Sequence, residues 1–337
     1  MSRRILVTGA AGFVGFHLCR ELLARGDAVV GTDNLNPYYQ VSLKRDRLAV
    51  LGEEKSFSFI QAGLENPDQM KDVFSKGPFD VVAHLGAQAG VRYSLEKPMV
   101  YVESNLTGFI NILENCRHNR VPHLVFASSS SVYGANVKMP FCETDTVDHP
   151  VSLYAATKKA DELMAHSYSS LFKLPVTGLR IFTVYGPWGR PDMAVYKFTK
   201  AIFEGTPVEI YNQGDMKRDF TYVSDIADGI IRVMGRAPQP DPAWDAALPA
   251  PDTSYAPYRI YNIGNNRPEN LMKLVDLLEK AVGKKADRRL LPMQAGDVKE
   301  TAADISRIQR DFGFAPKTTL EEGIPRFVEW YRGYYKL

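Results

Sequence analysis

A tyrosine and a lysine four residues apart form the first pair in the sequence that could move a proton. Tyr154 and Lys158, in the stretch YAATK, share one face of a predicted helix. A free tyrosine has a pKa of about 10 and is a poor base at neutral pH. A neighbouring ammonium lowers that pKa, so the tyrosine can take a proton from a hydroxyl group. The same spacing fits a surface pair on an amphipathic helix, and the rest of the chain must decide between the two.

A glycine-rich turn near the N-terminus predicts a phosphate site. VTGAAGFVG follows an apolar strand and opens a helix, with Gly9, Gly12 and Gly15 spaced three apart. Such glycines allow a tight turn and a close approach of the backbone to a diphosphate. Asp33 closes the next predicted strand about 20 residues further on, where a carboxylate can bind ribose hydroxyls. An acid there favours NAD over NADP, because it would repel the 2′-phosphate. A turn without a ligand is the alternative, which the strand, helix and acid together disfavour.

A run of serines lies between these two motifs, in FASSSSVYG at residues 126–134. Serine runs usually form loops that satisfy their own backbone. At the carboxyl end of a parallel strand, however, they face the cofactor crevice.

Apolar runs alternate with helical patterns through the first half of the chain, which predicts βαβ units. The expected fold is a Rossmann-type doubly wound parallel sheet, with a smaller α/β substrate-binding lobe at its carboxyl edge. We expect residues 1–185 to form the NAD-binding domain with the catalytic residues. Residues 186–337 form mainly the sugar-nucleotide-binding lobe, interleaved with the first domain. Strands are expected at 3–9, 27–33, 57–63, 79–87, 123–131 and 176–182, helices at 13–26, 156–172, 269–283 and 320–335, and an exposed loop at 237–257.

Composition excludes several classes of protein. The 337 residues are 45% hydrophobic and carry a net charge of +2, which leaves no basic footprint for nucleic acid. No apolar run is long enough to span a membrane, and the first residues enter a strand at once, so no signal peptide is expected. Three widely spaced cysteines predict reduced thiols and a cytoplasmic protein. The six histidines show no metal-binding spacing, and no metal is expected.

Together, the glycine spacing and YAATK resemble the extended short-chain dehydrogenase/reductase superfamily, the sugar-nucleotide epimerases and dehydratases. The resemblance runs over essentially the whole chain. Three stretches are similar to UDP-glucuronate 4-epimerases: AQAGVRYSLEKP (87–98), VYGPWGRPDM (184–193) and GDMKRDFTYVSDI (214–226). The resemblance implies a homodimer formed through two helices of each subunit.

The resemblance also implies roles for individual residues. It makes Ser129, Tyr154 and Lys158 catalytic. It implies that NAD is held by Tyr154, Lys158, Gly9, Gly12, Phe13, Val14, Gly15, Asp33, Asn34, Leu64, Leu85, Gly86, Ala87 and Ser104. It implies that the UDP-sugar is bound by Gln88, Arg92, Ser129, Ser130, Ser131, Thr183, Arg190, Arg218 and Asp297. Arg218 would bind the diphosphate, while Thr183 and Arg190 would face the hexose.

The implied reaction is epimerisation at C4 of UDP-glucuronate to give UDP-galacturonate, through a 4-keto sugar. Related dehydratases and decarboxylases carry acids where this chain has Ser130 and Ser131. Without such an acid, elimination lacks its general acid/base, and oxidation and re-reduction at one carbon remain. Two alternatives stay open: a UDP-glucose/UDP-galactose 4-epimerase, and a catalytically silent NAD-binding scaffold.

The loop VYGPWGRPDM raises the question of what Arg190 holds. We expect it to hold the C6 carboxylate of the uronate; the alternative is a pair with Asp192 that caps the bend. Arg92 is equally compatible with substrate binding and with anchoring its loop. The chain departs from the family pattern at Gly63, where an Asp usually contacts the adenine amine, and at Gln294, where UDP-galactose 4-epimerases use an Arg.

Overall fold

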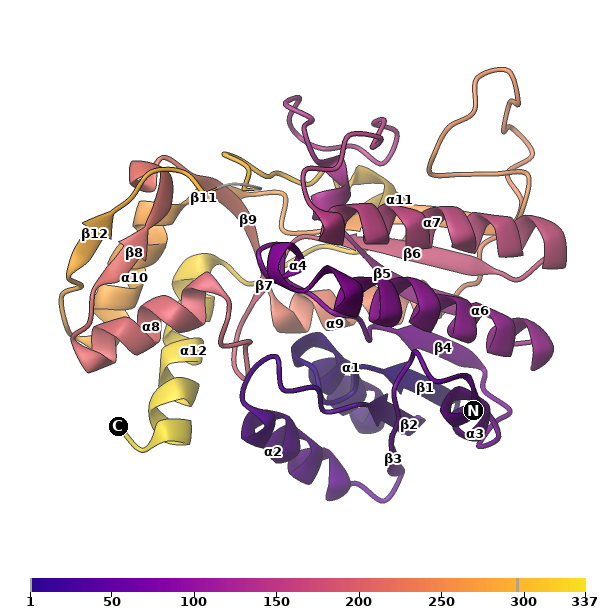
Figure 1. Cartoon of the computed structure of the whole chain (residues 1–337), viewed down its shortest axis with the longest axis horizontal. Helices are drawn as coiled ribbons and strands as arrows, with labels where there is room; N and C mark the ends of the chain where they lie inside the picture. Colours follow the sequence, from indigo (N-terminus) through magenta and orange to yellow (C-terminus); the bar gives the residue numbers. More distant parts are fainter. Residues whose placement is uncertain (1, 295–296) are drawn as a thin grey trace.

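A seven-stranded parallel sheet forms the centre of the larger part of the molecule (Figure 1). The computed structural model describes residues 2–294 and 297–337. The strand order is β10-β6-β5-β4-β1-β2-β3, and every neighbouring pair is parallel. The strands span β1 (Arg4–Thr8), β2 (Ala28–Asp33), β3 (Phe57–Gln61), β4 (Val81–His84), β5 (Leu124–Ser129), β6 (Val176–Ile181) and β10 (Tyr258–Ile263). The predicted doubly wound fold is confirmed, and all six predicted strands are present.

Alternate residues of each strand enter two different cores, as expected for a sheet covered on both faces. In β1, Ile5 and Val7 point to one core and Leu6 points to the other. The first core is covered by α1 (Phe13–Ala24), α9 (Val223–Met234) and α11 (Ser306–Phe312), with α2 (Val41–Gly52) beside α1. The second core is covered by α3 (Pro67–Phe74), α6 (Gly108–His118) and α7 (Leu153–Phe172).

A smaller lobe stands at the carboxyl edge of the sheet, at the left in Figure 1. It has its own apolar core, to which helices α8, α10 and α12 contribute. Its helices are α8 (Ala194–Glu204), α10 (Leu271–Val282) and α12 (Leu320–Tyr335). Its strands are β7 (Thr183–Tyr185), β9 (Lys217–Tyr222) and β11 (Pro268–Asn270) in one small sheet, and β8 (Val208–Ile210) with β12 (Arg288–Leu290) in another.

The chain passes five times between the two parts. After β9 it returns to the main sheet through α9 and adds β10 beside β6 as a seventh strand, which the sequence analysis did not predict. Residues 237–257 contain no helix or strand, as expected for a loop. Two short helices, α4 (Tyr93–Glu96) and α5 (Pro98–Tyr101), and a π-helical turn at Val102–Thr107 lead into α6.

In the part of the chain that the structure describes, no helix reaches the length and hydropathy that a bilayer crossing needs.

Candidate active site

Two cavities, of about 360 and 550 Å³, adjoin each other: the first lies at the carboxyl ends of the parallel strands, and the second is lined mainly by residues of the lobe. The first follows the ends of β1, β4 and β5, where the strand order reverses between β1 and β4. This switch point is where open α/β sheets bind ligands. The cavities share part of their lining, so one ligand can extend from the first into the second. The shared residues are Tyr38, Gly90, Val91, Thr183 and Met193.

Between β1 and α1 the chain makes the predicted glycine-rich turn. Gly9 has φ +71°, a backbone conformation that glycine adopts without strain. A Cβ atom on Gly15 would lie 2.1 Å from the carbonyl oxygen of Gly9, so only glycine permits this packing of helix on strand. The first N–H groups of α1 have no partner within the helix, and they point with its positive end toward the turn. This cradle fits the diphosphate of a dinucleotide.

Asp33, at the end of β2, also lies where a ribose acid is expected. Its Oδ1 accepts a hydrogen bond from the backbone N–H of Leu35 at 2.8 Å. The ammonium of Lys44, from α2, stands 3.6 Å from the same oxygen, and both side chains are 8% exposed. The sequence analysis missed Lys44, which also lines the cavity. The positive charge of Lys44 partly offsets the repulsion between Asp33 and a 2′-phosphate such as that of NADP.

At Gly63, where the chain departs from the family pattern, a neighbouring side chain fills the space that a larger residue would take. A Cβ atom there would lie 2.3 Å from Oε1 of Glu65, so the carboxylate of Glu65 occupies the space beside the glycine. The N–H of Gly63 donates to Oε1 of Gln69 at 2.7 Å. Leu64 lines the cavity as expected.

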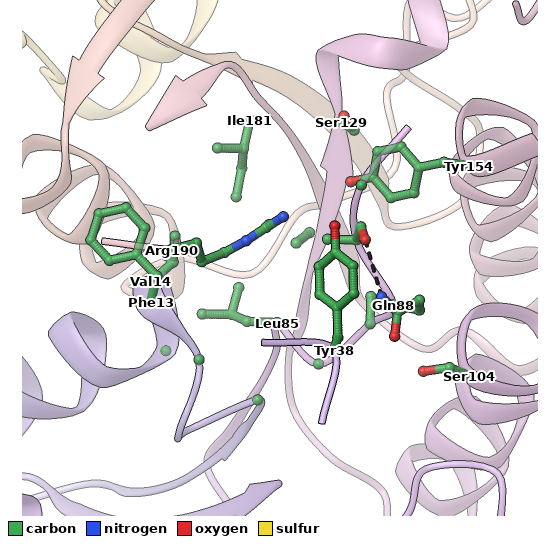
Figure 2. Close-up of a pocket in the computed structure, with 18 of the residues that line it drawn as sticks. Phe13, Val14, Tyr38, Leu85, Gln88, Ser104, Ser129, Tyr154, Ile181 and Arg190 are labelled. Atoms are coloured by element: carbon green, nitrogen blue, oxygen red, sulfur yellow. Dashed lines mark hydrogen bonds between the residues drawn. The ribbon is translucent and has the colours of Figure 1, made fainter. Parts of the chain in front are cut away.

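The three residues expected to be catalytic line the first cavity, and Ser129 and Tyr154 lie close together on one wall of it (Figure 2). Ser129 ends β5, while Tyr154 and Lys158 come from the first turns of α7. The Oγ of Ser129 donates to Oγ of Ser131 at 3.1 Å and accepts from the N–H of Ser131 at 3.1 Å. The hydroxyl end of Tyr154 points into the cavity close to Ser129 (Figure 2).

Lys158 has a partner that the sequence analysis missed. Its ammonium, 3% exposed, donates to Oδ2 of Asp161 at 3.0 Å and to the carbonyl oxygen of Ala127 at 3.0 Å. Burial raises the pKa of Asp161 to about 6, although Lys158 opposes that shift. The spacing of three residues on one helix could have revealed this pair.

Arg190 lines the same cavity as Ser129 and Tyr154, and its guanidinium reaches from the opposite wall toward them (Figure 2). It also pairs with Asp192: Nε donates to Oδ1 at 3.0 Å and Nη2 to Oδ2 at 2.5 Å. Tyr38 donates to the same Oδ2 at 3.1 Å. Although burial opposes the charge, Asp192 raises the pKa of Arg190 above its usual value.

The pair with Asp192, considered as the alternative for Arg190, is present, and it leaves part of the guanidinium unpaired. Asp192 takes the Nε–Nη2 edge of the guanidinium, while Nη1 donates to no group among the described residues. An arginine has five donors, so the Nη1–Nη2 edge can still hold a second carboxylate. Asp192 and Tyr38 are therefore part of the site, which the sequence pattern alone did not indicate for Tyr38.

The second cavity contains the remaining predicted substrate residues. Arg218 donates through Nη2 to Oδ1 of Asp297 at 2.7 Å, and burial lowers its pKa. The guanidinium of Arg92 stands 5.0 Å from the ring centre of Tyr211. Both arginines and Asp297 line this cavity, which places two cations where an anionic ligand would extend.

All of the other site residues named from the sequence line the first cavity, with Thr183 shared between the two. On the cofactor side these are Gly9, Gly12, Phe13, Val14, Gly15, Asp33, Asn34, Leu64, Leu85, Gly86, Ala87, Ser104, Tyr154 and Lys158, and on the substrate side Gln88, Ser129, Ser130, Ser131, Thr183 and Arg190. Within residues 2–294 and 297–337, no cluster of His, Cys, Asp and Glu could hold a metal ion.

The sequence of this chain is similar to known proteins that act on nucleotide sugars. Residues 5–264 match the family described as NAD dependent epimerase/dehydratase. A probable UDP-glucuronate 4-epimerase of Rhizobium meliloti is 48% identical over 99% of this chain and 98% of the relative.

Two solved structures of epimerases are similar to this chain over nearly its whole length. UDP-glucuronic acid 4-epimerase of Bacillus cereus, in complex with UDP-glucuronic acid and NAD, superposes with a TM-score of 0.87 at 32% identity, covering 98% of this chain and 100% of the other. UDP-glucose 4-epimerase of Thermotoga maritima, with UDP-glucose, gives 0.85 at 29% identity, covering 98% and 99%. The family match covers most of the chain, and the glycine-rich turn and the wall with Ser129, Tyr154 and Lys158 are both present. The chain therefore belongs to the NAD-dependent epimerase/dehydratase family.

Proposed function

We propose that the protein interconverts UDP-glucuronate and UDP-galacturonate by epimerisation at C4 of the sugar. The observation that carries the proposal is the placement of Arg190 in the same cavity as Ser129 and Tyr154. A guanidinium opposite the reacting hydroxyl suits a sugar whose C6 is a carboxylate. The similarity to UDP-glucuronate 4-epimerases over nearly the whole chain supports the same substrate.

NAD is the cofactor. The glycine cradle around Gly9 and Gly15 fits its diphosphate, Asp33 its ribose, and the wall formed by Ser129, Tyr154 and Lys158 lies at the other end of the cavity. When bound in this cavity, NAD would supply a hydride acceptor and donor for the oxidation and re-reduction of the sugar at C4.

The chain supplies the proton transfer and the orientation. Tyr154 takes the proton of the 4-hydroxyl and later gives it back, while the Oγ of Ser129 holds the 4-oxygen. Lys158 brings a positive charge to the same wall of the cavity as Tyr154. Ser130 and Ser131 bring no acid to the site, so the sugar is not directed toward elimination.

The keto sugar turns about its diphosphate linkage between the two hydride transfers. Arg218, in the second cavity and paired with Asp297, holds the diphosphate end. Arg190 holds the carboxylate, which matters because a 4-keto uronate is a β-keto acid. Loss of CO₂ is fast only if the C5–carboxylate bond stands perpendicular to the ketone plane. A two-point hold on both carboxylate oxygens keeps that bond near the plane.

Incubation of the purified protein with UDP-glucuronate, with no NAD added or only catalytic amounts, tests this function. We expect UDP-galacturonate, identified by anion-exchange chromatography and NMR. Release of NADH in amounts equal to the substrate, or a UDP-pentose as main product, would contradict it. The second candidate is a neutral-hexose 4-epimerase, which the similarity to the Thermotoga maritima structure favours. Faster turnover of UDP-glucose than of UDP-glucuronate would establish it.

Three further properties belong to the proposal. The enzyme works in the cytoplasm, where its thiols stay reduced. Residues 1–185 bind NAD and residues 186–337 bind mainly the sugar nucleotide. Two copies associate through α6 and α7, since α7 exposes Leu163 (60%), Leu171 (71%) and Phe172 (42%). Sedimentation of the protein and of Leu163→Glu tests the dimer, which the charge should weaken.

A further inference from the structure

One arginine outside the predicted site connects two of its loops. Arg47, on α2, is a charged residue with 0% exposure. Its Nη1 donates to the carbonyl oxygen of Ala11 at 2.8 Å, in the glycine-rich turn. Its Nη2 donates to the carbonyl oxygens of Trp188 at 2.6 Å and Gly189 at 3.3 Å. Gly189 directly precedes Arg190, so a single guanidinium touches both the phosphate turn and the loop of the carboxylate-binding arginine.

This burial is unusual because the partners are all neutral. Besides the three carbonyls, Arg47 donates to the hydroxyl of Tyr39 at 2.8 Å, and its Nε has no partner. No carboxylate forms an ion pair with Arg47 in the part of the chain described. A buried cation without an anion costs free energy. Arg47 is therefore held here by its contacts with the carbonyl groups of the glycine-rich turn and of the loop before Arg190.

The loop on the other side is held in a conformation that needs support. Trp188 has φ +61°, which a residue with a Cβ atom rarely adopts. Its ring packs against Phe16 of α1 at 5.3 Å and against Trp330 and Tyr334 of α12 at 5.5 and 5.3 Å between ring centres. The hydrogen bonds from Arg47 fix the carbonyl groups of the same turn. The direction in which Arg190 leaves the backbone is therefore set in part by Arg47.

We propose that Arg47 is a positioning residue that couples the phosphate turn of the NAD site to the loop carrying Arg190. The proposal rests on the proposed function, because it takes Arg190 as the residue that holds the uronate carboxylate. Loss of the guanidinium should loosen the glycine-rich turn and the loop that carries Arg190 together. It should not affect Arg218, which binds the diphosphate of UDP in the second cavity. Lysine keeps the charge but has a single nitrogen, which cannot donate to both loops in the geometry of the fork.

The test compares Arg47→Lys with Arg45→Lys, a matched control at an exposed position of the same helix. Three quantities are measured on the purified enzymes: hydrogen exchange of the segments 9–13 and 186–193, the NAD retained after gel filtration, and the Kd for UDP. We expect faster exchange in both segments and less retained NAD for Arg47→Lys, with an unchanged Kd for UDP. The kcat/KM for UDP-glucuronate should fall by about tenfold or more, because misplaced contacts of this kind reach that size. Arg45→Lys should match the wild type.

Faster exchange in only one of the two segments, or in neither, would overturn the coupling. So would an equal loss of UDP affinity, since it would indicate general loosening of the fold. If the wild-type enzyme itself failed to convert UDP-glucuronate, the proposed function would fail. The exchange and NAD-retention data would still decide whether Arg47 joins the two loops.

Discussion

Replacement of Arg190 by alanine gives the sharpest test of the carboxylate site. The side chain is 22% exposed and ion-paired with Asp192, so its charge acts in a partly dry region. Hydrogen bonds between charged groups in such a setting are each worth about 1.5–3 kcal/mol. Two of them on the free edge of the guanidinium, reduced by the remaining solvent contact, give about 2–4 kcal/mol. We therefore expect kcat/KM for UDP-glucuronate to fall by about 10²-fold or somewhat more.

Part of this loss has another source, because Arg190→Ala leaves Asp192, also mostly buried, without its cation. The variant Arg190→Ala with Asp192→Asn removes that contribution and isolates the contact with substrate. Arg190→Lys should recover only part of the activity, since lysine cannot bind both edges. A loosened carboxylate should also release CO₂, so some UDP-4-keto-pentose should appear.

The assay is kcat/KM for UDP-glucuronate, Kd for UDP by calorimetry, and the fraction of keto-pentose by chromatography. UDP lacks the carboxylate, so its affinity should barely change. An equal loss of affinity for UDP and for UDP-glucuronate would refute the reasoning, and Arg190 would then be a loop or diphosphate residue.

Three further outcomes are expected. Tyr154→Phe should keep the fold and the bound NAD but lower kcat by about 10²–10⁴-fold, measured by product formation, because only the proton carrier is lost; full activity would remove Tyr154 as the base. Arg218→Met should weaken UDP binding by roughly 10-fold or more in calorimetry, from the loss of a charge-assisted contact to phosphate; unchanged affinity would place the diphosphate elsewhere. Burial raises the pKa of Glu143, beside Arg307 and Asp252, from 4.5 to about 7. The folded protein therefore holds a proton that the unfolded chain loses, so stability falls as pH rises through that window. The Tm of Glu143→Gln should lack this part of the decline, and an unchanged slope would show that Glu143 does not cause it.

The sequence was sufficient for the features that depend on local pattern. The glycine spacing predicted the phosphate turn, because both the turn and the close contact of Gly15 with Gly9 are made within a few residues. Tyr154 and Lys158 were found since a helix places positions four apart on one face. The six predicted strands are apolar runs of the length that a buried parallel sheet requires.

Contacts between distant segments could not be predicted in the same way. Tyr38 reaches Asp192 across more than 150 positions, and Arg47 reaches Trp188 across more than 140. Neither has a spacing that marks it in the sequence. Arg47 looks like one more charge on an amphipathic helix, and only the fold reveals that it is buried. The strand β10 was missed because it follows the long loop 237–257 and pairs with β6, far back in the chain.

The late arrival of β10 has a consequence for how the protein is made. A ribosome releases the chain from its N-terminus, so β6 emerges with one edge open while residues 182–257 follow. Until Tyr258–Ile263 emerges, the backbone groups along that edge have no strand to pair with. Helices α9 and α11, which cover one face of the sheet, are also translated after β6, and α11 follows β10. The cofactor-binding half therefore cannot complete its packing during synthesis before most of the lobe has been translated, and the two halves mature as one unit.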